Sequence, residues 1–233
     1  MPATVDHADP HGIDAVQKIG TTLRFTHEGH PYVLRVPTSY SGERAFPLVI
    51  HLSGAGGLAM DGATSSHVAV TPTEYLVAYP QAGGLWWTPE ATANFSALLD
   101  ELLQTLHVDT NQVYISGFSN GGTGALYYAG LWPQRFAAAV SLMGAGNCLR
   151  EVNLHNLGQV PVLLVHGTDD RVIAARCSQD SQAALRNASP RVMPAVGSSS
   201  RMMEGPAASV RPRSRRRWSP WLRTPASRWR SPV

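Results

Sequence analysis

One serine in this 233-residue sequence has the surroundings of a nucleophile. The segment Gly117-Phe118-Ser119-Asn120-Gly121 fits the pattern G-x-S-x-G, with an apolar run before it and a helix-like run after it. On a sharp strand-to-helix turn such a serine adopts a strained backbone, and the positions two before and two after it must be almost free of side chain. Glycine meets that need at both positions. The spacing predicts that Ser119 is a nucleophile, and an ordinary Gly-rich turn is the alternative.

Two aspartates behind a later apolar run supply a candidate acid. A nucleophilic serine requires a base, the base requires an orienting carboxylate, and after this kind of turn the chain order is serine, acid, histidine. The run 160–166 is followed by Gly167-Thr168-Asp169-Asp170. We choose Asp170 over Asp169 as the acid, and a solvated turn is the alternative.

Backbone amides for an oxyanion hole are expected at two places. One is the amide of Asn120, which follows the nucleophile at a helix N-terminus, where the dipole favours negative charge. The other is in the glycine-rich segment 51–57, His-Leu-Ser-Gly-Ala-Gly-Gly, which follows an apolar run. There we favour the amide of Ala55, with Gly54 next.

No histidine follows the candidate acid. The nine histidines end at His166. His51 and His166 lie at the ends of predicted strands, where a substitute base would have to lie. The commoner role of such a histidine is a structural hydrogen bond, and we expect that role for both.

The elements that must position these residues alternate along the chain. Short apolar runs predict strands at 21–26, 32–37, 48–52, 75–79, 112–116, 138–143 and 160–166. Helical periodicity predicts helices at 92–106, 121–130 and 174–186. Strands that alternate with helices indicate an α/β fold whose mostly parallel sheet carries helices on both faces. The first two strands predict an antiparallel hairpin at its edge.

These segments together resemble the polyhydroxybutyrate depolymerase and feruloyl esterase-like branch of the α/β-hydrolases over about residues 21–186. The resemblance is carried by HPYVLRVPTSY, PLVIHLSGAGG, YLVAYPQ with Trp86-Trp87, DTNQVYISGFSNGG, RFAAAVSLMGAG and VHGTDDRV. It implies the α/β-hydrolase fold and hydrolysis of carboxylic esters through an acyl-enzyme at Ser119, with neither metal nor organic cofactor. Asp170 matches the family's acid position. Ser53 departs from the family, which usually has histidine there.

The end of the sequence departs further from that family, which places another strand and a loop with the catalytic histidine after the acid. We expect an N-terminal extension at 1–20, an α/β-hydrolase domain at 21–188 without the last strand and histidine loop, and an Arg/Ser/Pro-rich tail at 189–233. The tail is interpreted as an out-of-frame coding end or a disordered extension. We therefore expect a poorly stable protein with weak or absent esterase activity.

Charge separates the tail from the rest of the chain. Residues 1–190 carry nine Lys and Arg against fifteen Asp and Glu, a net −6, whereas residues 191–233 carry ten Arg against one Glu, a net +9. A nucleic-acid contact through these arginines and Trp218, Trp221 and Trp229 is a third interpretation of the tail. Apart from that exception, no nucleic-acid partner is expected.

Composition limits the remaining function classes. The apolar fraction of 43% is that of a globular protein, and no apolar run reaches the roughly 18 residues of a membrane span. The first 20 residues lack a signal-like apolar stretch, so a cytoplasmic location is expected, with secretion through a misassigned start as the alternative. The expected partner is a small or polymeric ester. A non-catalytic binding protein and a prolyl-oligopeptidase-type serine peptidase are the competing hypotheses, although the chain has no room for that peptidase's propeller domain.

Two cysteines and three aromatic residues complete the candidates. Cys148 and Cys177 are too few for a disulfide scaffold, and free thiols are expected. Trp86, Trp87 and Phe118 either line an acyl or aromatic pocket or belong to the core.

Overall fold

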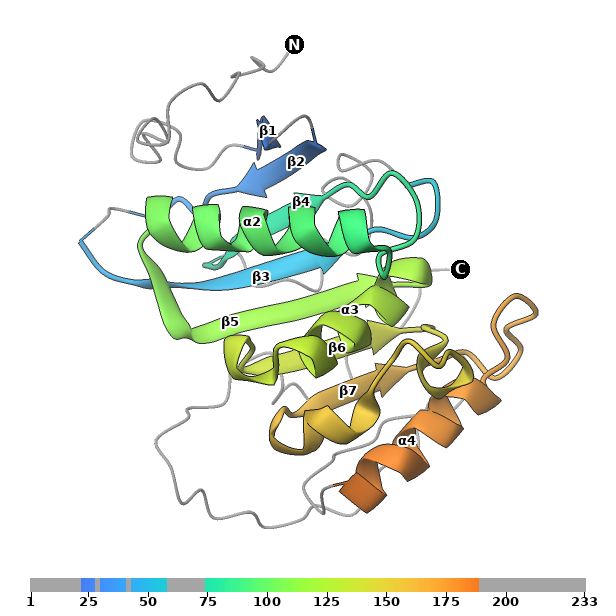
Figure 1. Cartoon of the computed structure of the whole chain (residues 1–233). Coiled ribbons are helices and arrows are strands. Elements are labelled where there is room, and N and C mark those ends of the chain that lie inside the picture. The colour runs from blue at the N-terminus through green and yellow to red at the C-terminus, as the bar shows by residue number, and fades with distance from the viewer. Residues whose placement is uncertain (1–21, 28–29, 41–42, 58–73, 189–233) are drawn as a thin grey trace, which may run out of the picture.

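The computed structural model describes residues 22–27, 30–40, 43–57 and 74–188 of the chain (Figure 1). The expected extension at 1–20 and the tail at 189–233, with its three interpretations, lie outside the described residues.

Seven strands of the described residues form one sheet, in the order β1-β2-β4-β3-β5-β6-β7 (Figure 1). They are β1 (Thr22–His27), β2 (His30–Arg35), β3 (Phe46–Leu52), β4 (Leu76–Pro80), β5 (Val108–Phe118), β6 (Ala138–Leu142) and β7 (Val162–Val165). β2 runs antiparallel to both β1 and β4, and every pairing from β4 to β7 is parallel. The mostly parallel sheet and its edge hairpin are therefore confirmed.

Side chains of the central strands alternate between two buried cores. Ile50 and Leu52 face a large core that also receives apolar residues of α2 (Pro89–Thr105), α3 (Asn120–Leu131) and α4 (Arg176–Ala188). Val49 faces a smaller core with tyrosines of β4 and β5. All three described helices contribute to the large core, so helices on the other face stay a prediction. None of these described helices is long and apolar enough to span a bilayer.

Element ends differ from the predictions where local polar contacts decide them. Helix α2 begins at Pro89, three residues early, because the Thr88 side chain caps it by accepting from the Ala91 amide. Strand β5 begins at Val108, because Val108 pairs with Phe46 of β3. The register shifts over the polar stretch that follows, which does not read as a strand. The sequence did not predict three 3₁₀ helices of the described residues, because they are too short to show a helical period in their apolar residues. They are η3 (Pro133–Arg135), η4 (Gly146–Cys148) and η5 (Leu154–Gln159).

The expectation of free cysteines is wrong, because Cys148 and Cys177 form a disulfide. Cys148 is the last residue of η4, which follows β6 in the sequence. Cys177 lies in the first turn of α4, which follows β7. Twenty-nine positions separate them in sequence, and the parallel pairing of β6 with β7 brings the segments that follow both strands to one edge of the sheet. The bond depends on this tertiary arrangement, which two isolated cysteines in a sequence do not reveal.

Candidate active site

Ser119 stands at the junction of β5 and α3, at the carboxyl edge of the sheet. Its backbone has φ 54° and ψ −117°, a conformation that a residue with a side chain rarely adopts. The Ser119 amide donates to the carbonyl of Leu142 at 2.8 Å, which fixes the turn to the end of β6. The strained strand-to-helix turn expected from the sequence is therefore present.

Glycines make this turn sterically possible. A Cβ at Gly117 would lie 2.1 Å from the carbonyl oxygen of Gly121, and a Cβ at Gly121 would lie 2.1 Å from that of Leu52. Neither separation is compatible with a side chain, and both partners are backbone atoms that cannot swing away. The expected absence of side chains on both sides of the serine is confirmed, while its nucleophilic role stays a prediction.

The glycine-rich loop after β3 lies beside this turn. Leu52 is in register with Gly117, and a Cβ on Gly54 would come within 3.0 Å of the Phe118 ring. Asn120 is the first residue of α3, so its amide has no acceptor within the helix. The fold therefore brings Asn120 and the loop that carries Ala55 to neighbouring strand ends, as an oxyanion hole requires.

A third loop, residues 81–88 between β4 and α2, braces both of these segments. The indole nitrogen Nε1 of Trp86 donates to the carbonyl of Ser53 at 2.9 Å. The side-chain amide of Asn120 donates to the carbonyl of Gly84 at 3.0 Å. Sequence reasoning missed this bracing role, because a tryptophan in a loop does not disclose which carbonyl its N–H will meet.

The side chain of Tyr128 in α3 forms a further hydrogen bond with the same loop. Its hydroxyl lies 2.6 Å from the carbonyl of Trp86 and 3.1 Å from that of Ala91. Burial raises the pKa of Tyr128 far above its ordinary value, so the hydroxyl keeps its proton and acts as a donor. The Tyr128 ring stacks on Phe95, with the ring centres 4.0 Å apart.

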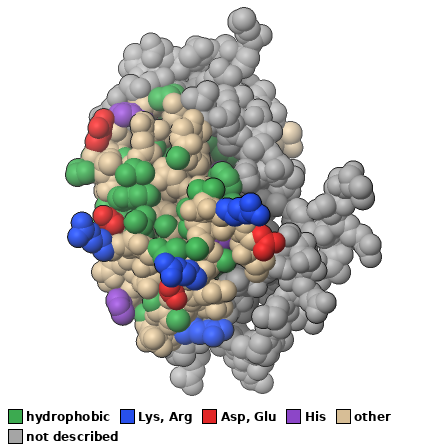
Figure 2. Space-filling model, turned by 90° about the vertical axis from the view of Figure 1, so that its right-hand side faces the viewer, with side chains coloured by type: hydrophobic (Ala, Val, Ile, Leu, Met, Phe, Trp, Pro, Cys, Tyr) green, Lys and Arg blue, Asp and Glu red, His purple; other side chains and the backbone are tan. Residues whose placement is uncertain are grey.

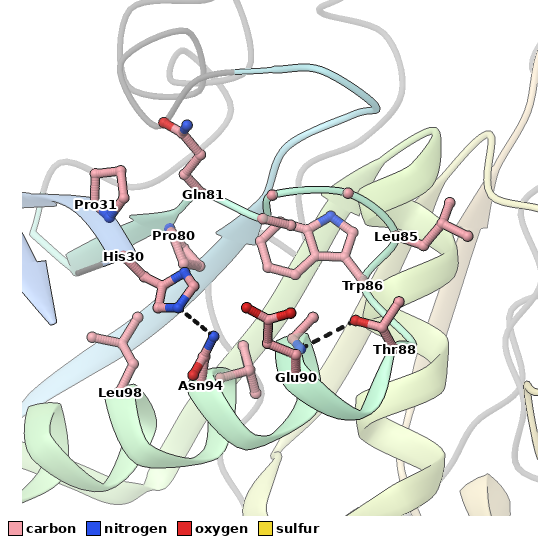
Figure 3. A pocket seen from close by; sticks show the side chains of 15 residues that line it. His30, Pro31, Pro80, Gln81, Leu85, Trp86, Thr88, Glu90, Asn94 and Leu98 are labelled. Carbon is pink, nitrogen blue, oxygen red and sulfur yellow. Dashed lines mark hydrogen bonds between the residues drawn. The ribbon is translucent and has the colours of Figure 1, made fainter. Parts of the chain in front are cut away.

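A cavity of about 310 Å³ opens beside this loop, between the carboxyl end of β4, the start of β2 and helix α2 (Figure 3). Trp86 and Leu98 contribute apolar walls, and Glu90 adds a carboxylate. Asn94 and His30 face each other across one side, with Nδ2 and Nε2 2.6 Å apart. Of the three aromatic residues considered from sequence, only Trp86 is among the described residues that line the cavity. Trp87 packs against the large core.

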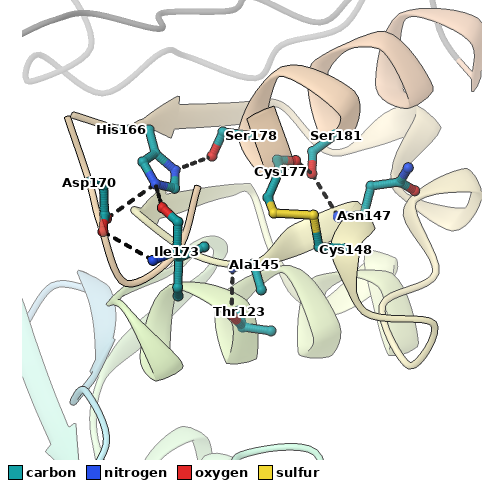
Figure 4. The surroundings of a disulfide bond; sticks show 10 residues. All are labelled: Thr123, Ala145, Asn147, Cys148, His166, Asp170, Ile173, Cys177, Ser178 and Ser181. Atoms are coloured by element: carbon teal, nitrogen blue, oxygen red, sulfur yellow. Dashed lines mark hydrogen bonds and ion pairs between the residues drawn. A yellow bond between two sulfur atoms is a disulfide. The ribbon is translucent and has the colours of Figure 1, made fainter. Parts of the chain in front are cut away.

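Asp170 lies in the loop after β7, and its carboxylate is held by the backbone. Oδ1 accepts from the amide of Val172 at 2.8 Å. It also accepts from the amide of Ile173 at 3.0 Å, the contact drawn in Figure 4. These two hydrogen bonds, chiefly that from Val172, lower the pKa of Asp170 and keep it ionised. Asp169 is exposed. The choice of Asp170 as the acid stays a prediction.

The two histidines considered as substitute bases are engaged elsewhere. His166 is fully buried, with Nδ1 2.7 Å from the hydroxyl of Ser178 and Nε2 2.8 Å from the carbonyl of Ile173. His51 lies against Tyr79 on the sheet face with the smaller core, with Nδ1 2.9 Å from the hydroxyl of Ser116. Both make the structural hydrogen bonds expected for them.

The structure brings some of the predicted site together and leaves the rest apart. Ser119, Asn120 and the Ala55 loop meet at the ends of β5 and β3, whereas Asp170 follows β7, the second strand along from β5. Within the described residues, no side chain forms a hydrogen bond with the Ser119 hydroxyl, and no histidine connects it to Asp170. The same residues contain no group of three or more His, Cys, Asp or Glu side chains that would hold a metal ion.

Sequence comparison relates the chain to ester hydrolases. The Phospholipase/Carboxylesterase family matches residues 87–204. NocK of Nocardia uniformis subsp. tsuyamanensis, whose name describes it as an esterase, is 30% identical over 138 residues. That match covers 53% of this chain and 40% of NocK, so the chain spans well under half of the curated relative.

Comparison with solved structures agrees on the fold. FphF, a fluorophosphonate-binding serine hydrolase of Staphylococcus aureus, aligns with a TM-score of 0.65 and 14% identity, over 77% of this chain and 90% of its own. A ferulic acid esterase aligns with a TM-score of 0.62 and 19% identity, over 73% of this chain and 84% of its own. At these identities the likeness establishes shared architecture alone, which is that of the α/β-hydrolases.

Proposed function

The chain belongs to the Phospholipase/Carboxylesterase family of α/β-hydrolases, and from this premise we propose that it hydrolyses carboxylic esters through an acyl-enzyme on Ser119. The observation that carries the proposal is the backbone of Ser119, strained at φ 54° between two glycines that have no room for a Cβ. Such strain persists only where the surrounding structure enforces it, and it is concentrated at functional sites.

The proposed reaction follows from the neighbours of Ser119. Its Oγ attacks the ester carbonyl carbon and gives up its proton, and the carbonyl oxygen becomes an oxyanion. The amides of Asn120 and Ala55 donate to that oxyanion, and the helix dipole of α3 favours the negative charge. Collapse of the intermediate releases the alcohol with a proton and leaves an acyl group on Ser119. Water then releases the carboxylic acid by the same steps.

The proton from Ser119 needs an acceptor, and none of the described histidines reaches it. Asp170 is the proposed acid that would orient such a base. In enzymes of this type, loss of the base leaves only the contribution of the oxyanion hole and of binding. We therefore propose that turnover by this chain is impaired by several orders of magnitude.

The cavity beside Trp86 is the proposed location of the part of the ester that does not react. It opens at the carboxyl edge of the sheet, the edge at which Ser119 stands, and the carbonyl of Gly84 in its lining accepts from the side chain of Asn120. Figure 2 views the molecule from this edge, and apolar side chains lie there among scattered charges of both signs. This surface suits an uncharged ester, small or polymeric.

Labelling with a fluorophosphonate probe, alongside turnover of p-nitrophenyl butyrate, tests the proposal. Because the base is missing, we expect slow wild-type labelling, which Ser119→Ala abolishes together with any turnover. Ser116→Ala is the matched control, because Ser116 lies three residues away on β5 and hydrogen bonds to His51. Equal labelling of the wild type and Ser119→Ala, or none in folded wild type, would overturn an acyl-enzyme on Ser119.

A non-catalytic acyl-binding function is the second candidate. It is favoured by one observation, the absence of a hydrogen-bond partner for the Ser119 hydroxyl within the described residues. Saturable binding of a non-hydrolysable ester analogue by folded protein that the probe does not label would support it. Binding abolished by Leu98→Trp, which fills the cavity, would place the ligand there.

The disulfide bears on where the protein works. Disulfides persist in oxidising compartments and are rare in the cytosol. We propose an oxidising location in place of the cytoplasmic one expected from sequence. Alkylation of unreduced protein from its native cells, followed by mass spectrometry, tests this: Cys148 and Cys177 should stay unmodified, and alkylation of both would contradict it.

A further inference from the structure

We propose that His166 and Ser178 are positioning residues for Asp170, and that the Cys148–Cys177 disulfide anchors them. The proposal rests on the proposed role of Asp170 as the acid of an ester hydrolase. In this proposal His166 does not exchange protons with substrate. It holds Asp170 in place within the loop 167–175, which we call the acid loop.

The first step is the attachment of α4 to the end of β6. The disulfide joins Cys148 of η4 to Cys177 in the first turn of α4. One turn later the hydroxyl of Ser181 donates to the carbonyl of Cys177 and accepts from the amide of Asn147 at 2.8 Å. The start of α4 is therefore held to η4 by a covalent bond and a hydrogen bond (Figure 4).

The second step passes from α4 to His166, because Ser178 follows Cys177 directly. Nε2 of His166 lies 2.8 Å from the carbonyl of Ile173, which can only accept, so Nε2 carries a proton. In the neutral ring Nδ1 is then an acceptor, and the Ser178 hydroxyl 2.7 Å away donates to it. The Ile173 carbonyl thereby sets the tautomer, and Ser178 holds the orientation of a ring that no solvent reaches.

The third step passes from His166 to the acid. Nε2 also lies 3.2 Å from Oδ2 of Asp170, so its one proton is shared between this oxygen and the carbonyl of Ile173, while Oδ1 accepts from the amides of Val172 and Ile173. Three donors therefore hold the two carboxylate oxygens. A carboxylate offers about four lone-pair sites, so one site remains for a catalytic base. The Asp170 side chain is 16% exposed, which is compatible with access from one side.

The acid loop needs this support because its own packing is sparse. A Cβ on Gly167 would meet no atom within 4 Å, and the side chain of Val172 is 90% exposed. Within the described residues, β7 is also the last strand of the sheet. A loop with so few apolar contacts opens readily unless side-chain hydrogen bonds fix it. The buried side chain of His166 contacts both Asp170 of this loop and Ser178 of α4.

Hydrogen exchange of the full-length protein tests the positioning directly. The amides of Val172 and Ile173 both donate to Asp170, so their protection reports whether the carboxylate is held. We expect Ser178→Ala to reduce their protection at least tenfold. The matched control is Ser181→Ala, which removes an equally buried hydroxyl of α4 and one hydrogen bond to η4 but leaves both the disulfide and the Ser178–His166 hydrogen bond in place. It should leave these two amides protected.

Rescue separates positioning from general stability. His166→Gln keeps an N–H donor near the Nε2 position and should retain part of the protection, whereas His166→Ala should lose it. Unchanged protection of Val172 and Ile173 in both Ser178→Ala and His166→Ala would overturn the proposal. If His166→Ala fails to fold, Ser178→Ala alone decides, with its near-UV circular dichroism as the check on folding.

Kinetics connects the positioning to the reaction. In wild type that the fluorophosphonate probe labels, we expect Ser178→Ala to lower kcat about tenfold with KM unchanged, because substrate does not touch Ser178. Lost protection with unchanged kcat would refute a role in catalysis. Unlabelled wild type would instead refute the proposed function, and the exchange data would still decide whether His166 and Ser178 hold Asp170.

Discussion

Two regions of the molecule are held together by different means. We call the surroundings of Ser119, the proposed nucleophile, the nucleophile side, and the surroundings of Asp170, the proposed acid, the acid side. Around Ser119 the contacts are between backbones: Gly117 and Gly121 each approach a carbonyl oxygen so closely that a Cβ would lie 2.1 Å from it. Around Asp170 the contacts depend on side chains: its carboxylate accepts two backbone amides, and a series of side chains leads from the disulfide through Ser178 to His166. One side is defined by the absence of side chains and the other by their presence.

The difference teaches how each side responds to change. Backbone atoms cannot relieve a steric clash by changing rotamer, so an atom added at such a contact displaces both segments of the fold. A side-chain network loses one interaction at a time, and each loss costs a limited free energy. We expect the nucleophile side to fail abruptly and the acid side to weaken by degrees.

The largest effect is expected where the backbones touch. Gly121→Ala places a Cβ against the carbonyls of Leu52 and Ser53, and it should cost at least about 4 kcal/mol of unfolding free energy. Gly167→Ala, on the acid side, meets nothing within 4 Å and should change stability by less than about 1 kcal/mol. Urea unfolding of both variants checks this, and equal losses would abolish the contrast between the two sides.

The disulfide should give the next largest effect. Closing a loop of 29 residues contributes about 3–4 kcal/mol in the chain-entropy estimate, so Cys148→Ala/Cys177→Ala should lose stability of that order. Urea unfolding without reductant measures the loss. Dithiothreitol should lower wild type to the level of the double variant and leave the variant itself unchanged. A wild type insensitive to reductant would contradict a stabilising bond.

Trp86 tests the bracing of the glycine-rich loop after β3. Trp86→Phe removes the N–H that the Ser53 carbonyl accepts, and we expect a loss of about 1–2 kcal/mol in unfolding free energy. The matched control is Trp87→Phe, because the Trp87 indole N–H has no hydrogen-bond partner among the described residues. Urea unfolding should show the smaller change for Trp87→Phe, and the reverse order would contradict a bracing role.

The smallest effect is a dependence of stability on pH at the acid. The backbone amides of Val172 and Ile173 lower the pKa of Asp170 in the folded state. Its stabilising contribution is therefore complete above the unfolded value of about 4 and is lost as pH falls through the lower folded value. The Tm advantage of wild type over Asp170→Asn should shrink from pH 5 to pH 2. Asp109, whose pKa is also lowered, is present in both proteins and cancels.

The sequence foretold the nucleophile side because its physical requirements are local. Glycines two before and two after Ser119, an apolar run before the turn and a helical period after it all follow from neighbouring positions. The parallel sheet was equally legible, since short apolar runs alternate with helical ones. Element ends moved, as at Pro89, where the side chain of Thr88 sets the start of α2, and the short 3₁₀ helices were not predicted.

By itself, then, the sequence determined the order of strands and helices along the chain, the turn at Ser119 and the choice of Asp170 as the candidate acid. Tertiary structure alone decided that Cys148 and Cys177 bond, that Trp86 braces the loop of Ser53, and that His166 turns its nitrogens to Ser178 and Asp170. The physical reason is the separation in sequence over which each interaction acts. Sterics and periodicity act between neighbours in the chain, whereas a disulfide or a buried hydrogen bond needs partners that only the folded sheet brings within reach.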